Sequence, residues 1–86
     1  MPTISQFFGI VIRMYYNDHA PPHFHAYYGK QAAVIAIETL QVSEGRLPRR
    51  ALALVLEWAA EHREELLEDW QLAELHEPLN EIDPLE

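Results

Sequence analysis

Three histidines and an aspartate crowd into one short segment, Asp18–His25, which also contains two consecutive prolines. In an extended strand His23 and His25 point to the same face, with their Cα atoms about 6.5–7 Å apart. At that separation the two imidazoles could share one ion or one substrate. The rigid proline pair could fold His19 or Asp18 back toward them. This segment is therefore the strongest chemical signal in the sequence.

One interpretation of the segment is a metal site. His23 and His25, with a third ligand from His19, Asp18 or Glu38, could hold zinc or another divalent transition metal and leave a position for water. The alternative is that the histidines only pack and form hydrogen bonds in a turn. Clustered titratable side chains are probabilistic signals of function.

A second interpretation is acid–base catalysis without a metal or other cofactor. Because imidazole ionises near neutral pH, His23 and His25 could serve as general base and general acid. Ribonuclease-type cleavage through an RNA 2′-hydroxyl needs such a pair, together with cations that hold the phosphate. A third interpretation is recognition of phosphate or bases without chemistry, in which Tyr27 or Tyr28 offers a stacking surface.

The cations for phosphate would come from the start of a predicted helix, where Arg46, Arg49 and Arg50 flank Leu47 and Pro48. Cations at a helix N-terminus oppose the helix dipole. The arrangement therefore favours a bound anion, such as phosphate, between exposed amides and guanidinium groups. Three solvated arginines are the simpler alternative. Two further basic residues could extend the patch, namely Arg13 and Lys30.

The elements that position these residues begin with strands. Alternating side chains predict a strand over residues 10–16, and aromatic and β-branched residues predict two more at 23–28 and 31–38. Gly29 and Lys30 between the last two predict a two-residue type II′ hairpin turn. That turn sets a register in which Tyr28 faces Gln31, Tyr27 faces Ala32, His25 faces Val34 and His23 faces Ala36.

This register assigns the two faces of the hairpin, since side chains alternate across a sheet. The apolar face is the predicted core and carries Phe24, Ala26, Ala33, Ile35 and Ile37. The opposite face carries His23, His25, Tyr27 and Glu38 beside the small side chains of Ala32, Val34 and Ala36. Those small neighbours leave room for a ligand.

A further turn and a short strand ending near Gly45 follow, and Pro48 suits the first position of a helix. An apolar stripe with a period near 3.6 continues to Ala73, and the two tryptophans are expected in the core. Arg63 interrupts the stripe, so we predict a bend or break at residues 62–64. The sequence predicts an α+β fold, in which a small antiparallel sheet of three or four strands is covered on one face by a C-terminal helix or helix pair.

Composition limits the classes of protein. The 86 residues carry a net charge of −8 and no cysteine, which excludes disulfides, thiolate zinc sites and a cysteine nucleophile. We expect one domain over residues 1–86, with a β-rich part (1–47), a helical part (48–76) and an irregular tail (77–86).

Charge is unevenly distributed along the chain. Residues 1–50 have a net charge of +2 and residues 51–86 a net charge of −10, which suggests two faces with different functions. With no long apolar run and no signal-peptide pattern, we expect a cytoplasmic protein without a membrane partner.

Several segments also resemble a known bacterial family, catalogued as domain of unknown function 4160. The resemblance spans residues 1–77 and includes MPTIS, FGI, NDHAPPHFHAYYG, LPRRALALVLEW and HREELLEDWQLA. Leu40 stands where relatives often have a turn residue such as glycine. The family's members resemble one half of a two-gene module whose second gene encodes another small protein. That second protein often belongs to the family called domain of unknown function 2442, and the modules resemble toxin–antitoxin pairs.

This resemblance implies a component of a toxin–antitoxin-like module. Combined with the histidines and arginines, it leads us to expect binding or cleavage of nucleic acid, with RNA ahead of DNA. The expected partners are the nucleic acid and the second protein of the module. Two alternatives remain open: a histidine-based metal-binding domain, and a noncatalytic module that binds a protein partner.

Overall fold

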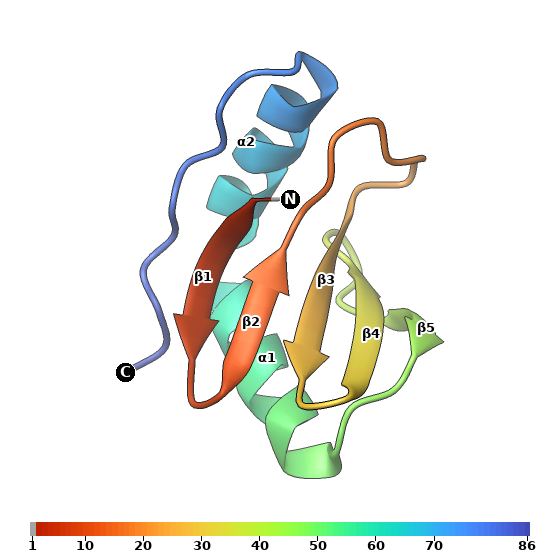
Figure 1. The fold of residues 1–86 in the computed structure, drawn as a ribbon, viewed down its shortest axis with the longest axis vertical. Coiled ribbons are helices and arrows are strands. Elements are labelled where there is room, and N and C mark those ends of the chain that lie inside the picture. The colour runs from red at the N-terminus through yellow and green to blue at the C-terminus, as the bar shows by residue number, and fades with distance from the viewer. Residues whose placement is uncertain (1) are drawn as a thin grey trace.

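The computed structural model describes residues 2–86, and Met1 lies outside the described residues. Five strands come first: β1 (Thr3–Phe7), β2 (Ile10–Arg13), β3 (His23–Tyr28), β4 (Gln31–Ala36) and β5 (Val42–Gly45). Two helices follow: α1 (Arg49–Glu61) and α2 (Arg63–Glu74). The strands form one antiparallel sheet in the order β1-β2-β3-β4-β5, with the helices on one face (Figure 1). The predicted α+β class is confirmed.

The expected count of three or four strands is wrong, because it omitted β1. This strand pairs with β2 through a two-residue turn at Phe8 and Gly9, whose φ angles are 48° and 80°. Positive φ at both turn positions is the type I′ geometry, which matches the twist of the flanking strands. Phenylalanine is an unusual residue for the first of these positions, so the turn signal was weak. The second strand also ends at Arg13, before residue 16.

The β3–β4 hairpin has the predicted register at all four predicted pairs, from Tyr28 with Gln31 to His23 with Ala36. Gly29 has a positive φ of 59°, whereas Lys30 does not have a positive φ. A type II′ turn requires this combination at its two central positions. The short strand ending at Gly45 is also confirmed. Leu40, before that strand, has φ 60° in the left-handed region, where glycine is the residue most easily accommodated.

The hydrophobic core lies between the sheet and the helices. The predicted core face of the hairpin is buried, with every member 2% exposed or less: Phe24, Ala26, Ala33, Ile35 and Ile37. The Trp58 ring of α1 packs against it, with its centroid 6.0 Å from that of Phe24. Burial of this apolar face is the main source of stability for the fold.

The helical part breaks where the sequence predicted, since α1 ends at Glu61 and α2 begins at Arg63. Pro48 serves as the N-terminal cap residue of α1, one position before the helix begins. None of the helices within residues 2–86 has the length and apolar character needed to cross a membrane.

The segment 77–86 has no regular secondary structure, yet it is packed along the edge of β1 (Figure 1). The backbone N–H of Ile82 donates to the carbonyl oxygen of Ile4 at 2.8 Å, and the Ile82 side chain is buried. The indole N–H of Trp58 donates to the carbonyl oxygen of Asp83, also at 2.8 Å. The tail therefore extends the core and covers an edge strand that would otherwise be open.

Candidate metal centre

The loop between β2 and β3 carries Asp18 back over the start of β3. There the Asp18 Oδ2 atom accepts hydrogen bonds from Nε2 of His23, at 2.8 Å, and from Nε2 of His25, at 3.1 Å. The other carboxylate oxygen, Oδ1, accepts from the backbone N–H of His19 at 3.0 Å. One carboxylate thus joins both histidines of the His-x-His pair.

These contacts hold Asp18 in its charged form. Partial burial raises the pKa of the Asp18 carboxyl, but the hydrogen bonds from His25, His23 and the His19 backbone lower it by more. The net pKa lies below the ordinary value of 3.8. At neutral pH the group is therefore a carboxylate, which is the form that binds metal ions.

The ring of His23 is held at both nitrogens. Its Nδ1 atom lies 2.8 Å from the carbonyl oxygen of Pro21, and since a carbonyl can only accept, Nδ1 carries the proton of that bond. The ring is also buried, 5.1 Å from the Trp70 ring of α2 between centroids. The carbonyl keeps a proton on Nδ1, so a metal ion that displaced the Nε2 proton would meet the Nε2 lone pair in a ring already oriented, as hydrogen-bond partners of metal-bound histidines arrange.

The ring of His25 is more open, with 22% of the side chain exposed. Tyr15 meets it edge-on at 4.6 Å and Tyr27 is stacked at 6.4 Å between centroids. The hydroxyl groups of these two tyrosines are hydrogen-bonded to each other. Burial, the Tyr15 hydrogen bond and the neighbouring Tyr15 charge raise the pKa of Tyr27 to about 12, even though the Arg13 charge lowers it. Tyr27 therefore stays protonated at neutral pH and supports the ring of His25.

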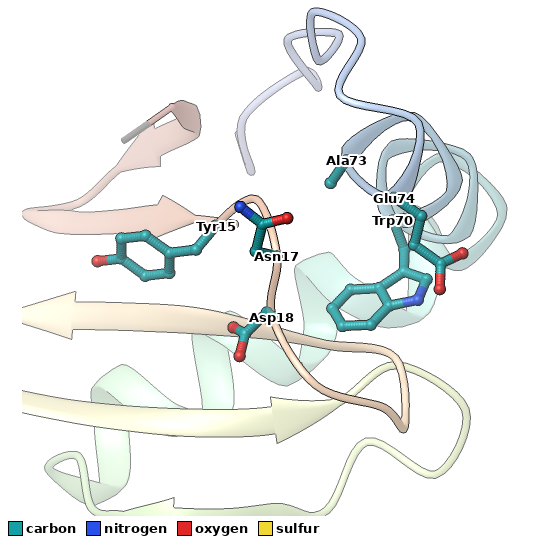
Figure 2. A pocket seen from close by; sticks show the side chains of 6 residues that line it. All are labelled: Tyr15, Asn17, Asp18, Trp70, Ala73 and Glu74. Atoms are coloured by element: carbon teal, nitrogen blue, oxygen red, sulfur yellow. The ribbon is translucent and has the colours of Figure 1, made fainter.

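A cleft of about 310 Å³ opens beside Asp18, between the loop and α2. Figure 2 shows its lining, with Tyr15, Asn17 and Asp18 on one side and Trp70, Ala73 and Glu74 on the other. The Asp18 side chain is 17% exposed, so the histidine–aspartate cluster is reachable from solvent. A small ligand in this cleft would meet the cluster at Asp18.

The cluster has the donors of a transition-metal site. One ligand atom from each of Asp18, His23 and His25 lies within 4.8 Å of the others. Tetrahedral zinc with bonds of about 2.0–2.2 Å places its ligand atoms about 3.3 Å apart. The separations of 2.8 Å and 3.1 Å between Asp18 Oδ2 and the two imidazoles are close to that spacing, so a small outward shift would admit an ion. Two imidazoles and one carboxylate are a donor set of zinc hydrolases and of non-haem iron enzymes.

Two further residues that the sequence offered as ligands lie outside this cluster. The side chain of His19 is 77% exposed, and its Nε2 atom lies 3.9 Å from Asp18 Oδ1. Glu38 is exposed beyond the end of β4. Within residues 2–86, the group of side chains that could hold a metal consists of Asp18, His23 and His25.

The arginines lie at the other end of the sheet from the histidines. His23 begins β3, whereas the backbone N–H of Arg46 bonds to Ala32 O, next to the β3–β4 turn. Arg49 and Arg50 open α1 at that same end (Figure 1). The Tyr27 ring is stacked against that of His25 on the face of the sheet that carries the cluster. The structure thus separates two groups of residues that the sequence analysis joined in one site.

Four cleft residues were not singled out as functional from the sequence: Tyr15, Asn17, Trp70 and Glu74. Trp70 was expected in the core, and it is 4% exposed while also contacting His23. Its second role depends on where α2 crosses the loop, which no local pattern encodes.

Comparison with known proteins identifies one family. Residues 9–71 match the model of the family described as Domain of unknown function (DUF4160), a region that includes the cluster, the arginines and most of both helices. No curated protein and no solved structure matches the chain.

Proposed function

We propose a function for this chain, which belongs to the DUF4160 family of domains of unknown function. The proposal is argued from the geometry of the site. The domain binds one divalent transition-metal ion, zinc first, through Asp18, His23 and His25, and uses that ion to activate water in the adjoining cleft. This is a metal-dependent hydrolytic function.

The observation that carries the proposal is the convergence on Asp18 Oδ2. Both Nε2 atoms lie within 3.1 Å of this one oxygen, and the opposite nitrogen of His23 is already occupied by the Pro21 carbonyl. A general acid and a general base that cleave a bond act from different sides of it. Two imidazoles aimed at one point suit a shared cation better.

The cleft supports a catalytic role ahead of a purely structural one. Structural zinc sites are closed by four protein ligands, whereas catalytic sites have three and keep a position for water. Here one of the three ligands, Asp18, lines an open cleft of about 310 Å³. A bound zinc ion would lower the pKa of its water to about 7 and so supply hydroxide at neutral pH. Asn17 and Glu74 are the polar groups placed to orient a substrate across the cleft.

The test is metal content together with activity. Protein stripped with a chelator and reloaded with zinc, cobalt, manganese or iron should retain one ion per chain after desalting, and should hydrolyse simple esters or phosphodiesters only when loaded. Protein that retains no ion with any of the four metals would refute the proposal.

A second candidate is metal-independent cleavage of RNA by His23 and His25, within a toxin–antitoxin-like module. Its specific support is the Asp18–His25 contact, because a carboxylate that accepts from an imidazole orients it for proton transfer. Induced expression without any neighbouring gene tests it. Two results together would favour this candidate over the metal centre. The native chain would arrest growth while His23→Ala/His25→Ala, at equal folded levels, would not. The purified native chain would also cleave RNA at a rate that zinc does not change.

A third role needs no chemistry. A module that only docks the second small protein of its gene pair would copurify with it, and would do so equally well after both histidines are replaced. That outcome would leave the metal proposal to be decided by the zinc-loading result alone.

A further inference from the structure

We propose that the end of the molecule opposite the metal centre binds single-stranded nucleic acid. The surface, called here the hairpin-end surface, consists of Phe8, Tyr28, Lys30, Arg46, Arg49 and Arg50. This inference is independent of the metal proposal, because none of these residues belongs to the histidine–aspartate cluster.

Three separate segments meet at this end. The β1–β2 turn supplies Phe8, the β3–β4 turn follows Tyr28, and α1 begins with Arg49 and Arg50 (Figure 1). Phe8, Tyr28 and Arg50 line one groove of about 330 Å³. The two aromatic rings and a guanidinium group therefore border the same space.

Positive charge is concentrated and unpaired on this surface. Four of the six lysines and arginines lie here, and all four are exposed, in a chain whose net charge is −8. Each of the four ion pairs within residues 2–86 has a histidine as its cation, so none of these four basic side chains is neutralised by a carboxylate. The first turn of α1 has no acidic residue, whereas the first turn of α2 has Glu64 and Glu65. An anionic ligand is what this distribution fits.

Both aromatic residues leave a large part of their surface in solvent. Phe8 is 60% exposed and Tyr28 is 41% exposed, unusual fractions for side chains of this size. Phe8 also has φ 48°, a region that bulky side chains rarely adopt. The type I′ turn requires this backbone conformation, but asparagine or aspartate would meet that requirement with less strain than an exposed phenylalanine. Such outliers are found at functional positions.

Exposed rings beside unpaired cations are the combination that binds single strands. Bases stack on aromatic faces without sequence preference, while lysine and arginine follow the phosphates. An acidic protein segment would also form ion pairs with the basic side chains, but it would stack on the aromatic rings less well than planar bases do. We therefore assign the surface to a single strand of RNA or DNA.

The experiment is fluorescence anisotropy with short labelled RNA and DNA single strands of mixed sequence, in buffer containing a chelator. The native chain should bind at low salt, and the logarithm of its association constant should fall by about 0.7 per phosphate contact for each tenfold rise in salt. Phe8→Asn should weaken binding about fivefold or more, because one stacked base is lost, while its thermal unfolding verifies that it remains folded.

A charge-matched pair tests the location. Arg50→Gln should weaken binding and reduce the salt slope by about 0.7. Arg13→Gln removes the same charge from the face near Tyr27 and should leave both unchanged. The proposal is overturned if binding is absent or insensitive to salt, or if the two arginine variants have equal effects. It is also overturned if the chain binds polyglutamate in preference to both oligonucleotides, which would indicate an acidic protein partner. Because the chelator is present throughout, failure here leaves the zinc result unaffected.

Discussion

His23 presents its Nε2 atom to Asp18 Oδ2 at 2.8 Å while its Nδ1 atom faces the Pro21 carbonyl at the same distance. Both nitrogens of a buried ring thus point at oxygen acceptors. The same Oδ2 atom also lies 3.1 Å from Nε2 of His25. A single cation among these three atoms would take the place of both histidine–aspartate contacts and leave the Pro21 hydrogen bond intact.

Metal binding should stabilise the fold. A ligand present at 100 times its dissociation constant adds about 2.7 kcal/mol to the free energy of unfolding. For a domain of this size each kcal/mol raises the melting temperature by about 4–8 °C. We expect zinc to raise the melting temperature by about 10 °C or more, and a chelator to reverse the shift. A melting temperature that zinc does not change would contradict a metal site in the folded state.

Two glycines in the left-handed region should respond differently to alanine. A Cβ on Gly45, at φ 73°, would lie 2.1 Å from the backbone oxygen of Ala32, whereas one on Gly29, at φ 59°, would meet nothing within 4 Å. Gly29→Ala should cost about 1–2 kcal/mol from backbone conformation alone. Gly45→Ala should cost clearly more, because β4 and β5 must also move apart. Urea unfolding measures both, and equal costs would show that β5 does not approach β4 so closely.

The tail should contribute measurable stability. Ile82→Ala removes a buried side chain that packs on β1, so we expect a loss of about 2–3 kcal/mol in the free energy of unfolding. The neighbouring Glu81→Ala changes an exposed side chain and should stay within about 0.5 kcal/mol. A tail that is detached in solution would make the two variants indistinguishable.

Asp69 should give stability an unusual pH dependence. Its carboxyl is fully buried, and Oδ1 accepts from the backbone N–H of Asn80 at 2.9 Å. Burial raises the pKa of Asp69 above 3.8, the Asn80 hydrogen bond lowers it less, and Glu68 and Glu65 raise it further. The folded state therefore holds the proton more tightly than the unfolded state does. The stability due to protonated Asp69 is complete below pH 3.8 and is lost as pH rises through the higher folded pKa.

The measurement is the difference in unfolding free energy between the native chain and Asp69→Asn across this acidic range. Asparagine retains a carbonyl oxygen for the Asn80 hydrogen bond and does not titrate. The native chain should lose stability relative to the variant as pH rises. A constant difference, or one that grows in favour of the native chain, would contradict a raised pKa.

The sheet was largely predictable because its information is local. Gly29 and Lys30 define the turn, and the alternation on either side of it fixes which side chains are buried. The first strand was missed because its turn at Phe8 and Gly9 lacks the usual asparagine or aspartate. Regular structure was thus accessible wherever residue type and backbone geometry agreed.

The site was only partly predictable. Asp18 and the two histidines were candidates from their spacing, but the choice of Asp18 over His19 and Glu38 depends on how the loop folds back. The separation of the arginines was implied by the predicted hairpin itself. His23 lies five residues before Tyr28 at the turn, a distance of about 17 Å along a strand.

Zinc titration calorimetry on chelator-stripped protein tests the metal centre most directly. We predict one zinc ion per chain for the native protein and for His19→Ala, whose altered side chain is exposed and outside the cluster. Asp18→Asn should weaken zinc affinity by more than about 100-fold, since the loss of a group that only hydrogen-bonds to a metal ligand costs about 10–100-fold. Absence of saturable binding by the native chain, or an affinity that Asp18→Asn leaves unchanged, would contradict the account.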